Sequence, residues 1–290
     1  MHAIPALRPS PIAGAWYEGR ADRLARAVDG YLDGAELPEL PGEVIAVIAP
    51  HAGHVYSGPV AGYAFAAVRG RTFDLAAVIS PMHQPRHEPL LTTAHEAYTT
   101  PLGAVPVDAD VLADLDRRLR ERLGHGVTPV AHDREHSLEI ELPFLQRALA
   151  GGFQLLPVMV GAHSTRLSRE LGAALAATLA GRSALLVAST DLSHFYPQEA
   201  AARYDAEMLA RIEAFDPEGA FRAEAEDRGY ACGLGALAAV LWAARALGAD
   251  AVKILRHATS GDMTGDFSSV VGYGAAAVLR TEAGATSTHR

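Results

Sequence analysis

The sequence predicts an α/β fold, a single-domain sandwich in which helices flank a central, largely parallel or mixed sheet. Four short apolar runs, at 44–49, 75–79, 155–160 and 184–188, have the length of strands. Each run is apolar almost throughout, as is typical of strands buried on both faces. The longer segments between the runs show helical periodicity, and alternation of this kind indicates crossover connections in an α/β protein.

The other predicted elements follow from spacing and from residues that cap or break helices. Pro59 stands at the favoured first position of a helix, and Asp108 is a suitable N-cap. Pro143 is expected to end or kink the helix in which it lies. The predicted helices cover 24–32, 59–68, 111–123, 137–149, 167–179 and 198–214, with another after 216–218 and a last one from Cys232-Gly233 to Gly248. Further strands are expected at 104–107, 252–257 and 270–279.

Composition restricts the classes of function. Of the 290 residues 49% are hydrophobic, the net charge is −9, and no block of basic residues is present, which argues against nucleic acid and anionic membranes as partners. The single cysteine, Cys232, excludes an internal disulfide framework and fits a reducing cytosol. We see no signal peptide and no membrane-spanning run. The expectation is a cytoplasmic protein with one domain over 1–280 and a disordered tail over 281–290.

Polar residues follow three of the four core strands at once. The run that ends in AVIAPHAGHVYSGP is the first case, and the residues concerned are His51 and His54, then His83 and His87, then Asp191 and His194. Strand ends that are far apart in sequence are close together in a parallel sheet, and ligands of open α/β sheets bind in the crevice at their carboxyl ends. Neutral imidazole suits iron, copper, zinc and nickel. The pattern therefore predicts a metal site, in which a carboxylate beside His194 would fix its tautomer.

A third metal ligand is less clear from the residues alone. Cys232 stands at a predicted helix start, where free N–H groups favour a thiolate and lower its pKa. A lone cysteine is more often a small core residue. Glu135, His136, Glu139 and Glu141 also offer donor atoms. Among them we expect Glu141 to be a solvated charge and the turn that contains His136 to face the site.

Six ordered motifs together resemble the Memo family. They are IAPHAGHVYSG, SPMHQ, EHSLEIELPFL, STDLSH, YACG and SGDMTGDFSSVVGYGA, and the similarity extends from AGAWYEG to the last predicted strand. The resemblance implies the fold of the class III, non-haem iron extradiol dioxygenases. It places the family's metal ligands on His51, His83 and Cys232. It places Asp191 and His194 beside the metal as catalytic residues, with His194 at the position of the dioxygenases' acid/base histidine.

The resemblance also implies a substrate pocket and a difference from the dioxygenases. Trp16 and Tyr56 match aromatic residues at the pocket mouth, and we expect His136 in the same pocket. The dioxygenases complete a triad of two histidines with a carboxylate, whereas this chain has Cys232 in that place. A soft thiolate favours copper or zinc more than a carboxylate does, and it changes the electronics at iron. Catechol-ring cleavage is therefore a weaker expectation than the fold.

The expected function is that of a Memo-like metalloprotein with a mononuclear iron or copper site and a redox or oxygen-dependent role. One alternative is a non-catalytic module that binds a peptide or protein in the same pocket. A second is a zinc hydrolase in which His194 serves as base. Bacterial and archaeal members are often named component B of the AmmeMemoRadiSam group. This naming implies an AMMECR1-type protein and a radical SAM enzyme as partners, besides a small molecule or peptide in the pocket.

Overall fold

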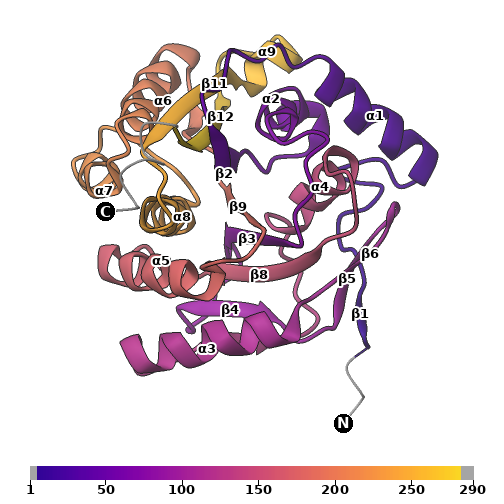
Figure 1. Cartoon of the computed structure of the whole chain (residues 1–290). Helices are drawn as coiled ribbons and strands as arrows, with labels where there is room; N and C mark the ends of the chain where they lie inside the picture. The colour runs from indigo at the N-terminus through magenta and orange to yellow at the C-terminus, as the bar shows by residue number, and fades with distance from the viewer. Residues whose placement is uncertain (1–4, 282–290) are drawn as a thin grey trace.

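A central sheet runs through the molecule, with helices against both of its faces (Figure 1). The computed structural model describes residues 5–281. Four parallel strands form the middle of the sheet in the order β2, β9, β3, β8. They span Glu43–Ala49 (β2), Leu75–Pro81 (β3), Gln154–Val160 (β8) and Ala184–Ser189 (β9). Each lies within two residues of its predicted apolar run, so the predicted core strands are confirmed.

Further strands extend this centre on both sides. β12 (Val270–Arg280) runs antiparallel to β2, and β11 (Ala251–Thr259) and β10 (His194–Tyr196) both pair antiparallel with β12. On the other side β4 (Leu90–Thr93) is antiparallel to β8, and β7 (Thr128–Val130) is parallel to β4. The sheet is therefore mixed, which confirms the predicted α/β class. Sequence analysis does not predict β4, β7 and β10, because runs of three or four residues show no clear periodicity.

The helices form two layers, one on each face of the sheet (Figure 1). One layer contains α1 (Ala21–Asp33), α2 (His54–Ala66) and α4 (Leu142–Ala148). The other contains α3 (Ala109–Leu123), α5 (Thr165–Leu179), α6 (Gln198–Glu213), α7 (Pro217–Ala225) and α8 (Leu234–Ala246). A short helix, α9 (Ser260–Thr264), connects β11 to β12.

Both faces of the central strands are buried, which explains why their sequences are apolar without alternation. In β2, Ala46 and Ile48 belong to the hydrophobic cluster beneath α5 and α8. Val47 and Ala49 belong to the cluster beneath α1 and α2. Successive side chains of a strand point to opposite faces, so a strand covered on both sides needs an apolar residue at every position.

The carboxyl ends of the central strands meet at one edge, which we call the carboxyl edge. Ala49 at the end of β2 pairs with Ser189 at the end of β9. Ile79 of β3 pairs with Ala188 of β9. Because the strands are parallel and in this register, the segments that follow them start side by side. The sheet therefore brings together the residues that the sequence analysis found after each strand.

A second, three-stranded sheet contains the start of the described chain. β1 (Leu7–Arg8) pairs parallel with β5 (Ala97–Thr100), and β6 (Gly103–Pro106) pairs antiparallel with β5. Of these strands only β6 was expected. The pairing of β1 with β5 places Arg8 beside the loop 131–138, which leads into α4.

α2 begins at His54, so the predicted helix start at Pro59 is wrong. The His54 backbone N–H donates to the Trp16 carbonyl at 2.8 Å, which satisfies a donor of the first turn. Close packing against α1 holds the following turns, because a Cβ on Gly62 would lie 2.4 Å from the Tyr31 carbonyl oxygen. Tertiary contacts thus outweigh the backbone hydrogen bond that Pro59 removes inside the helix.

A helix is present within the predicted range 137–149, but the predicted start near Ser137 and the predicted end or kink at Pro143 are wrong. Residues Glu139–Glu141 form one 3₁₀ turn, and α4 starts at Leu142 with Pro143 in its first turn. Proline is well tolerated there because the first turn needs no N–H donor. The consequence matters for the site, since 131–138 stay irregular and can reach the carboxyl edge.

Two predicted helix caps are present. Asp108 Oδ1 accepts a hydrogen bond from the Val111 N–H at 3.0 Å, and Asp216 Oδ1 accepts one from the Gly219 N–H at 2.8 Å. Apart from Thr281, the tail expected at 281–290 lies outside the described residues. Within 5–281, no helix combines the length and the apolar character needed to cross a bilayer.

Candidate metal centre

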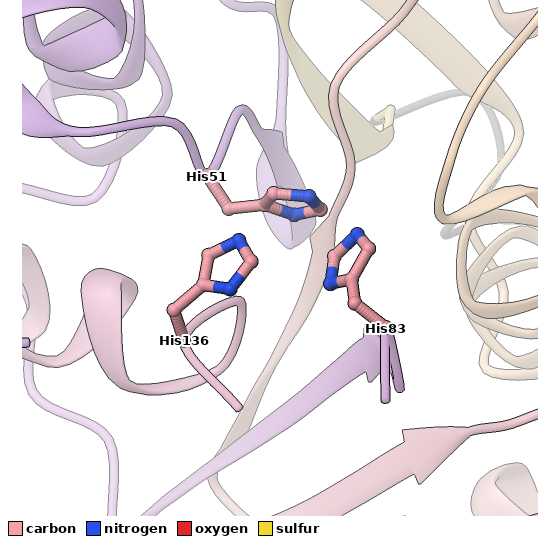
Figure 2. A group of neighbouring side chains, drawn as sticks. All are labelled: His51, His83 and His136. Carbon is pink, nitrogen blue, oxygen red and sulfur yellow. The ribbon is translucent and has the colours of Figure 1, made fainter. Parts of the chain in front are cut away.

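Three imidazole rings meet at the carboxyl edge (Figure 2). His51 follows β2, His83 follows β3, and His136 lies in the loop before α4. One ring nitrogen of each histidine lies within 4.8 Å of the others. His51 is buried, His136 is half-buried and His83 is exposed, so the group is open to solvent on the side of His83. Nitrogen donors gathered from three segments in this way are suited to a first-row transition metal.

A hydroxyl group fixes the orientation of His51. His51 Nδ1 lies 2.9 Å from Ser189 Oγ, which itself lies 2.7 Å from the Ser137 carbonyl oxygen and 2.7 Å from Glu141 Oε1. The Ser189 hydroxyl donates its proton to the Ser137 carbonyl or to Glu141. Its Oγ therefore accepts the hydrogen bond from His51 Nδ1–H. This arrangement leaves the lone pair of His51 on Nε2, which faces Cys232 Sγ at 3.1 Å.

Glu141 is buried, so its prediction as a solvated charge is wrong. The side chain is fully enclosed, and its Oε2 has no hydrogen-bond partner among residues 5–281. Burial raises the pKa of Glu141 well above its usual value, which favours the neutral carboxylic acid at pH 7. A neutral Glu141 behind Ser189 places no full negative charge beside His51.

A carboxylate fixes the orientation of His83. His83 Nδ1 lies 2.9 Å from Glu135 Oε1. Glu135 also accepts backbone hydrogen bonds from His83 at 2.6 Å and from His136 and Ser137 at 3.0 Å each. Burial opposes ionisation of Glu135, but the hydrogen bonds that it accepts from the His83 ring and the Ser137 N–H hold its pKa below the usual range. Glu135 therefore orients His83 and leaves Nε2 free for a metal, as carboxylate partners of metal-binding histidines do.

His136 lies between His83 and Trp16. Its ring is nearly parallel to that of His83, with centroids 4.7 Å apart, and the centroid of the Trp16 ring lies 4.1 Å from that of His136. Burial lowers the pKa of His136 to about 4, so the ring is neutral at pH 7 and able to bind a metal. Sequence analysis places His136 in the pocket. The structure brings it closer, into the group of three nitrogens.

Cys232 lies beside His51 at the edge of this group. Its Sγ is 3.1 Å from His51 Nε2 and accepts a hydrogen bond from the Asp191 N–H at 3.3 Å. A nitrogen about 2.1 Å and a sulfur about 2.3 Å from one metal are about 3.1 Å apart when they subtend a right angle. The spacing of Sγ and Nε2 therefore fits two neighbouring ligands of one ion. The sulfur lies outside the group of three nitrogens.

The expected lowering of the Cys232 pKa by a helix start is not found. Burial, together with the nearby charge of Asp191, raises the pKa of the thiol well above its usual value. Cys232 precedes Gly233, the N-cap of α8, so the thiol lies outside the first turn, where the effect of a helix terminus is strongest. A bound metal would be needed to hold the sulfur as a thiolate.

The structure places Asp191 and His194 beside the cluster with different contacts. Asp191 Oδ1 accepts the His51 N–H at 2.7 Å, and burial raises the pKa of Asp191 to about 7. His194 Nδ1–H donates to the Leu192 carbonyl at 2.9 Å, so the backbone, rather than Asp191 as expected, fixes its tautomer. Burial lowers the pKa of His194, and its Nε2 is left as a free basic atom.

The second histidine of each predicted pair lies away from the cluster. His54 is buried in α2, where its Nε2 is 3.1 Å from the Ile140 carbonyl and its ring packs on Phe144 at 4.8 Å. His87 is exposed in the loop before β4. Both lie outside the group of three nitrogens within the described chain.

A hollow of about 490 Å³ lies beside the cluster, and several aromatic side chains line it. We call this hollow the aromatic groove. The predicted pocket residues Trp16 and Tyr56 both line it, with 38% and 43% of their surfaces exposed. Phe195 and Tyr273 line it too, and sequence analysis missed both. Phe195 is 74% exposed and has a φ of 64°, which is strained for a residue with a side chain. Its position directly after His194 was the only sequence signal.

A buried arginine holds the loop that carries Glu135 and His136. Arg8 pairs with Asp133 through two hydrogen bonds, Nη2 to Oδ1 at 2.6 Å and Nε to Oδ2 at 3.2 Å. The same Nη2 donates to the Glu135 carbonyl at 2.8 Å, and Nη1 pairs with Glu139. All of these side chains are buried. Sequence analysis missed Arg8, since no local pattern marks a contact between residues 125 positions apart.

Comparison with known proteins gives matches over nearly the whole chain. A family model described as Memo-like protein matches residues 8–277. A MEMO1 family protein of Methanothermobacter thermautotrophicus is 35% identical over 276 residues, or 92% of this chain and 98% of that protein. MEMO1 family proteins of Methanopyrus kandleri and Nitrosopumilus maritimus are 33% and 32% identical, covering 92% and 93% of this chain and 97% and 98% of their own. Because the family model covers nearly the whole chain and these relatives match it from end to end, this chain belongs to the Memo family.

Proposed function

We propose that this protein binds a single iron or copper ion at the carboxyl edge and uses it in a redox or oxygen-dependent reaction. The convergence of His51, His83 and His136 carries the proposal. Ser189 and Glu135 occupy the Nδ1 atoms of His51 and His83, so two unprotonated nitrogens are held ready for a metal. Such preorganisation is typical of metal-binding histidines.

His51, His83 and Cys232 would be the three protein ligands of the metal. His136 would lie next to the metal as a further nitrogen donor. The sulfur lies at a suitable distance from His51 Nε2. A thiolate with imidazoles is a softer donor set than two histidines and a carboxylate, and this difference favours copper relative to iron. A bound iron or copper ion supplies one-electron redox chemistry to such a site.

The remaining residues have roles in proton transfer and binding. His194 presents a free Nε2 and would accept or donate a proton at the substrate. Asp191 accepts a hydrogen bond from the His51 N–H and so holds the backbone of the segment that follows β2. Trp16 and Tyr56 would contact the organic part of a small-molecule or peptide substrate in the aromatic groove.

Metal analysis of protein purified without added metal tests the proposal. Iron or copper, together with a spectral change on exposure to oxygen, would support it, and His51→Ala should lose the metal. Zinc without an oxygen-dependent change would favour the predicted alternative, a hydrolase that uses metal-bound water with His194 as base. Failure to bind iron or copper even in a direct titration would overturn the proposal.

A second candidate function is binding of a peptide or protein in the aromatic groove. The exposure of Phe195, Tyr56 and Trp16 around one hollow favours it, because aromatic anchors dominate many recognition surfaces. The dye 1-anilinonaphthalene-8-sulfonate should bind the wild type, and a Tyr56→Ser/Phe195→Ser variant should lose that binding while it keeps its metal. Unchanged dye binding in this variant would count against a binding role for the groove.

The partners and location implied by the family resemblance belong to this proposal as well. An AMMECR1-type protein and a radical SAM enzyme would act with this protein in the cytoplasm on a common modification pathway. Co-purification of the three proteins from cells that express them together tests this. If all three are expressed at similar levels and this protein purifies without the other two, the proposal is contradicted.

A further inference from the structure

A cleft at the edge of the sheet opposite to the histidines contains several arginines. It lies where β2, β3 and β9 begin, and its volume is about 970 Å³. The charged and aromatic residues that line it are Glu43, Arg71, Phe73, Arg182, Arg245 and Arg280. A seven-residue strand is about 23 Å long, so this arginine cleft is separated from the imidazoles by the full length of the central strands.

The charge of the arginine cleft is opposite to that of the whole chain. Four arginines stand against one glutamate, which gives the cleft a net charge of +3 in a protein of net charge −9. At physiological ionic strength charges are screened beyond about 8 Å. A ligand inside the cleft therefore responds to the local arginines and only weakly to the acidic remainder of the surface.

Three of these arginines have no acidic partner. Most arginines of the described chain lie within 4.0 Å of a carboxylate oxygen, as Arg147 does with Asp29. Within residues 5–281, no such pair involves Arg71, Arg182 or Arg245. Arg280 does pair with Glu43, so the two charges cancel. The uncompensated charge of the cleft is thus the charge of Arg71, Arg182 and Arg245.

Two of the three guanidinium groups are held in place. Arg182 Nε donates to the Thr178 carbonyl at 3.1 Å. Arg245 donates through Nη2 to the Phe215 carbonyl and lies over the Phe215 ring at 4.4 Å. A guanidinium has five N–H donors, and each of these contacts uses one of them. Four N–H donors of each group remain for a ligand, and because the two side chains are already anchored, less side-chain entropy is lost when a ligand binds.

We infer that the arginine cleft binds a phosphate-bearing small molecule with at least two negative charges. Guanidinium groups match phosphate oxygens in bidentate geometry, and such charge-assisted hydrogen bonds are stronger than neutral ones. The cleft has the volume of a site for a molecule of nucleotide size. This inference is independent of the metal centre and of its proposed function.

The competing explanation is that the arginines only satisfy the ends of helices. Carbonyl groups at helix C-termini carry partial negative charge, and Thr178 lies in the last turn of α5. Capping of α5 explains only the Arg182 Nε–H, which donates to the Thr178 carbonyl. It does not explain why Arg71, with no side-chain hydrogen bond among residues 5–281, lies in the same cleft. Capping alone predicts that the cleft has no affinity for anions.

Calorimetric titration of the protein as purified, with inorganic pyrophosphate as probe, separates the two explanations. We expect one pyrophosphate to bind per chain, and inorganic phosphate to bind more weakly because it carries fewer charges. Arg182→Gln/Arg245→Gln should weaken pyrophosphate binding at least tenfold. Arg71→Gln should weaken it several-fold, and this variant protects the test against misfolding because it removes no side-chain hydrogen bond or ion pair among residues 5–281.

Two control variants complete the test. Arg23→Gln/Arg166→Gln removes two exposed arginines that also lack a carboxylate partner within the described chain but lie outside the cleft, and it should leave affinity unchanged. His83→Ala should likewise leave it unchanged, which excludes binding at the imidazoles. Absence of binding to the wild type, equal loss in the Arg23→Gln/Arg166→Gln variant, or loss in His83→Ala would each overturn the inference.

Discussion

His83 Nδ1 and Glu135 Oε1 lie 2.9 Å apart, and this buried carboxylate also accepts the backbone N–H groups of His83 and His136. Glu135→Gln keeps the shape of the side chain but removes the charge that orients His83. We expect it to lower metal affinity about 10- to 100-fold, as loss of such partners does in other metal sites. Competitive metal titration measures the change. Glu218→Gln, at an exposed ion pair, is the control and should match the wild type.

Arg8→Met should lower the free energy of unfolding by about 3–5 kcal/mol, because it leaves Asp133 and Glu139 buried without their cation. Urea denaturation gives this value. The matched control is Arg147→Met, which removes an exposed pair with Asp29 and should cost less than about 1 kcal/mol. Equal effects of the two variants would show that Arg8 does not stabilise the loop that carries Glu135.

Cys232→Ala should weaken metal binding severely, while His136→Ala should weaken it less. The reason is the distance of 3.1 Å between Cys232 Sγ and His51 Nε2, which fits two ligands of one ion. Metal loading of the wild type should also slow alkylation of Cys232, because a coordinated thiolate is shielded from the reagent. Unchanged affinity of Cys232→Ala together with metal-independent alkylation would remove Cys232 from the site and leave His136 as third ligand.

Cys232→Asp should keep a metal but shift the preference from copper toward iron. The substitution replaces a soft sulfur with a hard oxygen and restores the two-histidine, one-carboxylate set. The measurement is the ratio of iron to copper affinity in both proteins. A ratio that stays the same would show that the side chain at position 232 does not contact the metal.

His194→Ala should leave the metal content nearly unchanged and abolish turnover. His194 lies beside the cluster, but its ring is held by the Leu192 carbonyl, and it is not one of the three clustered histidines. Metal content per chain is measured alongside oxygen consumption in the presence of a reductant. Loss of metal in this variant would instead identify His194 as a ligand.

Several parts of the fold could be read from local sequence, and others could not. The four central strands were predictable because strands buried on both faces are continuously apolar. Asp108 and Asp216 marked helix starts because an N-cap is a local hydrogen bond. The helix starts predicted at Pro59 and near Ser137 were wrong, since packing at the carboxyl edge and against α1 decides where α2 and α4 begin.

The sequence by itself determined the α/β class and the placement of His51 and His83 after two core strands. Both properties depend on residues that are neighbours along the chain, or on the general rule that parallel strands end at one edge. Only the tertiary structure decided that His136 joins them, that Glu141 is buried, and that Arg8 and Glu135 support the site. These contacts join residues 48 to 131 positions apart. Pairing at such separations follows from the closing of the sheet and leaves no periodic pattern in the sequence.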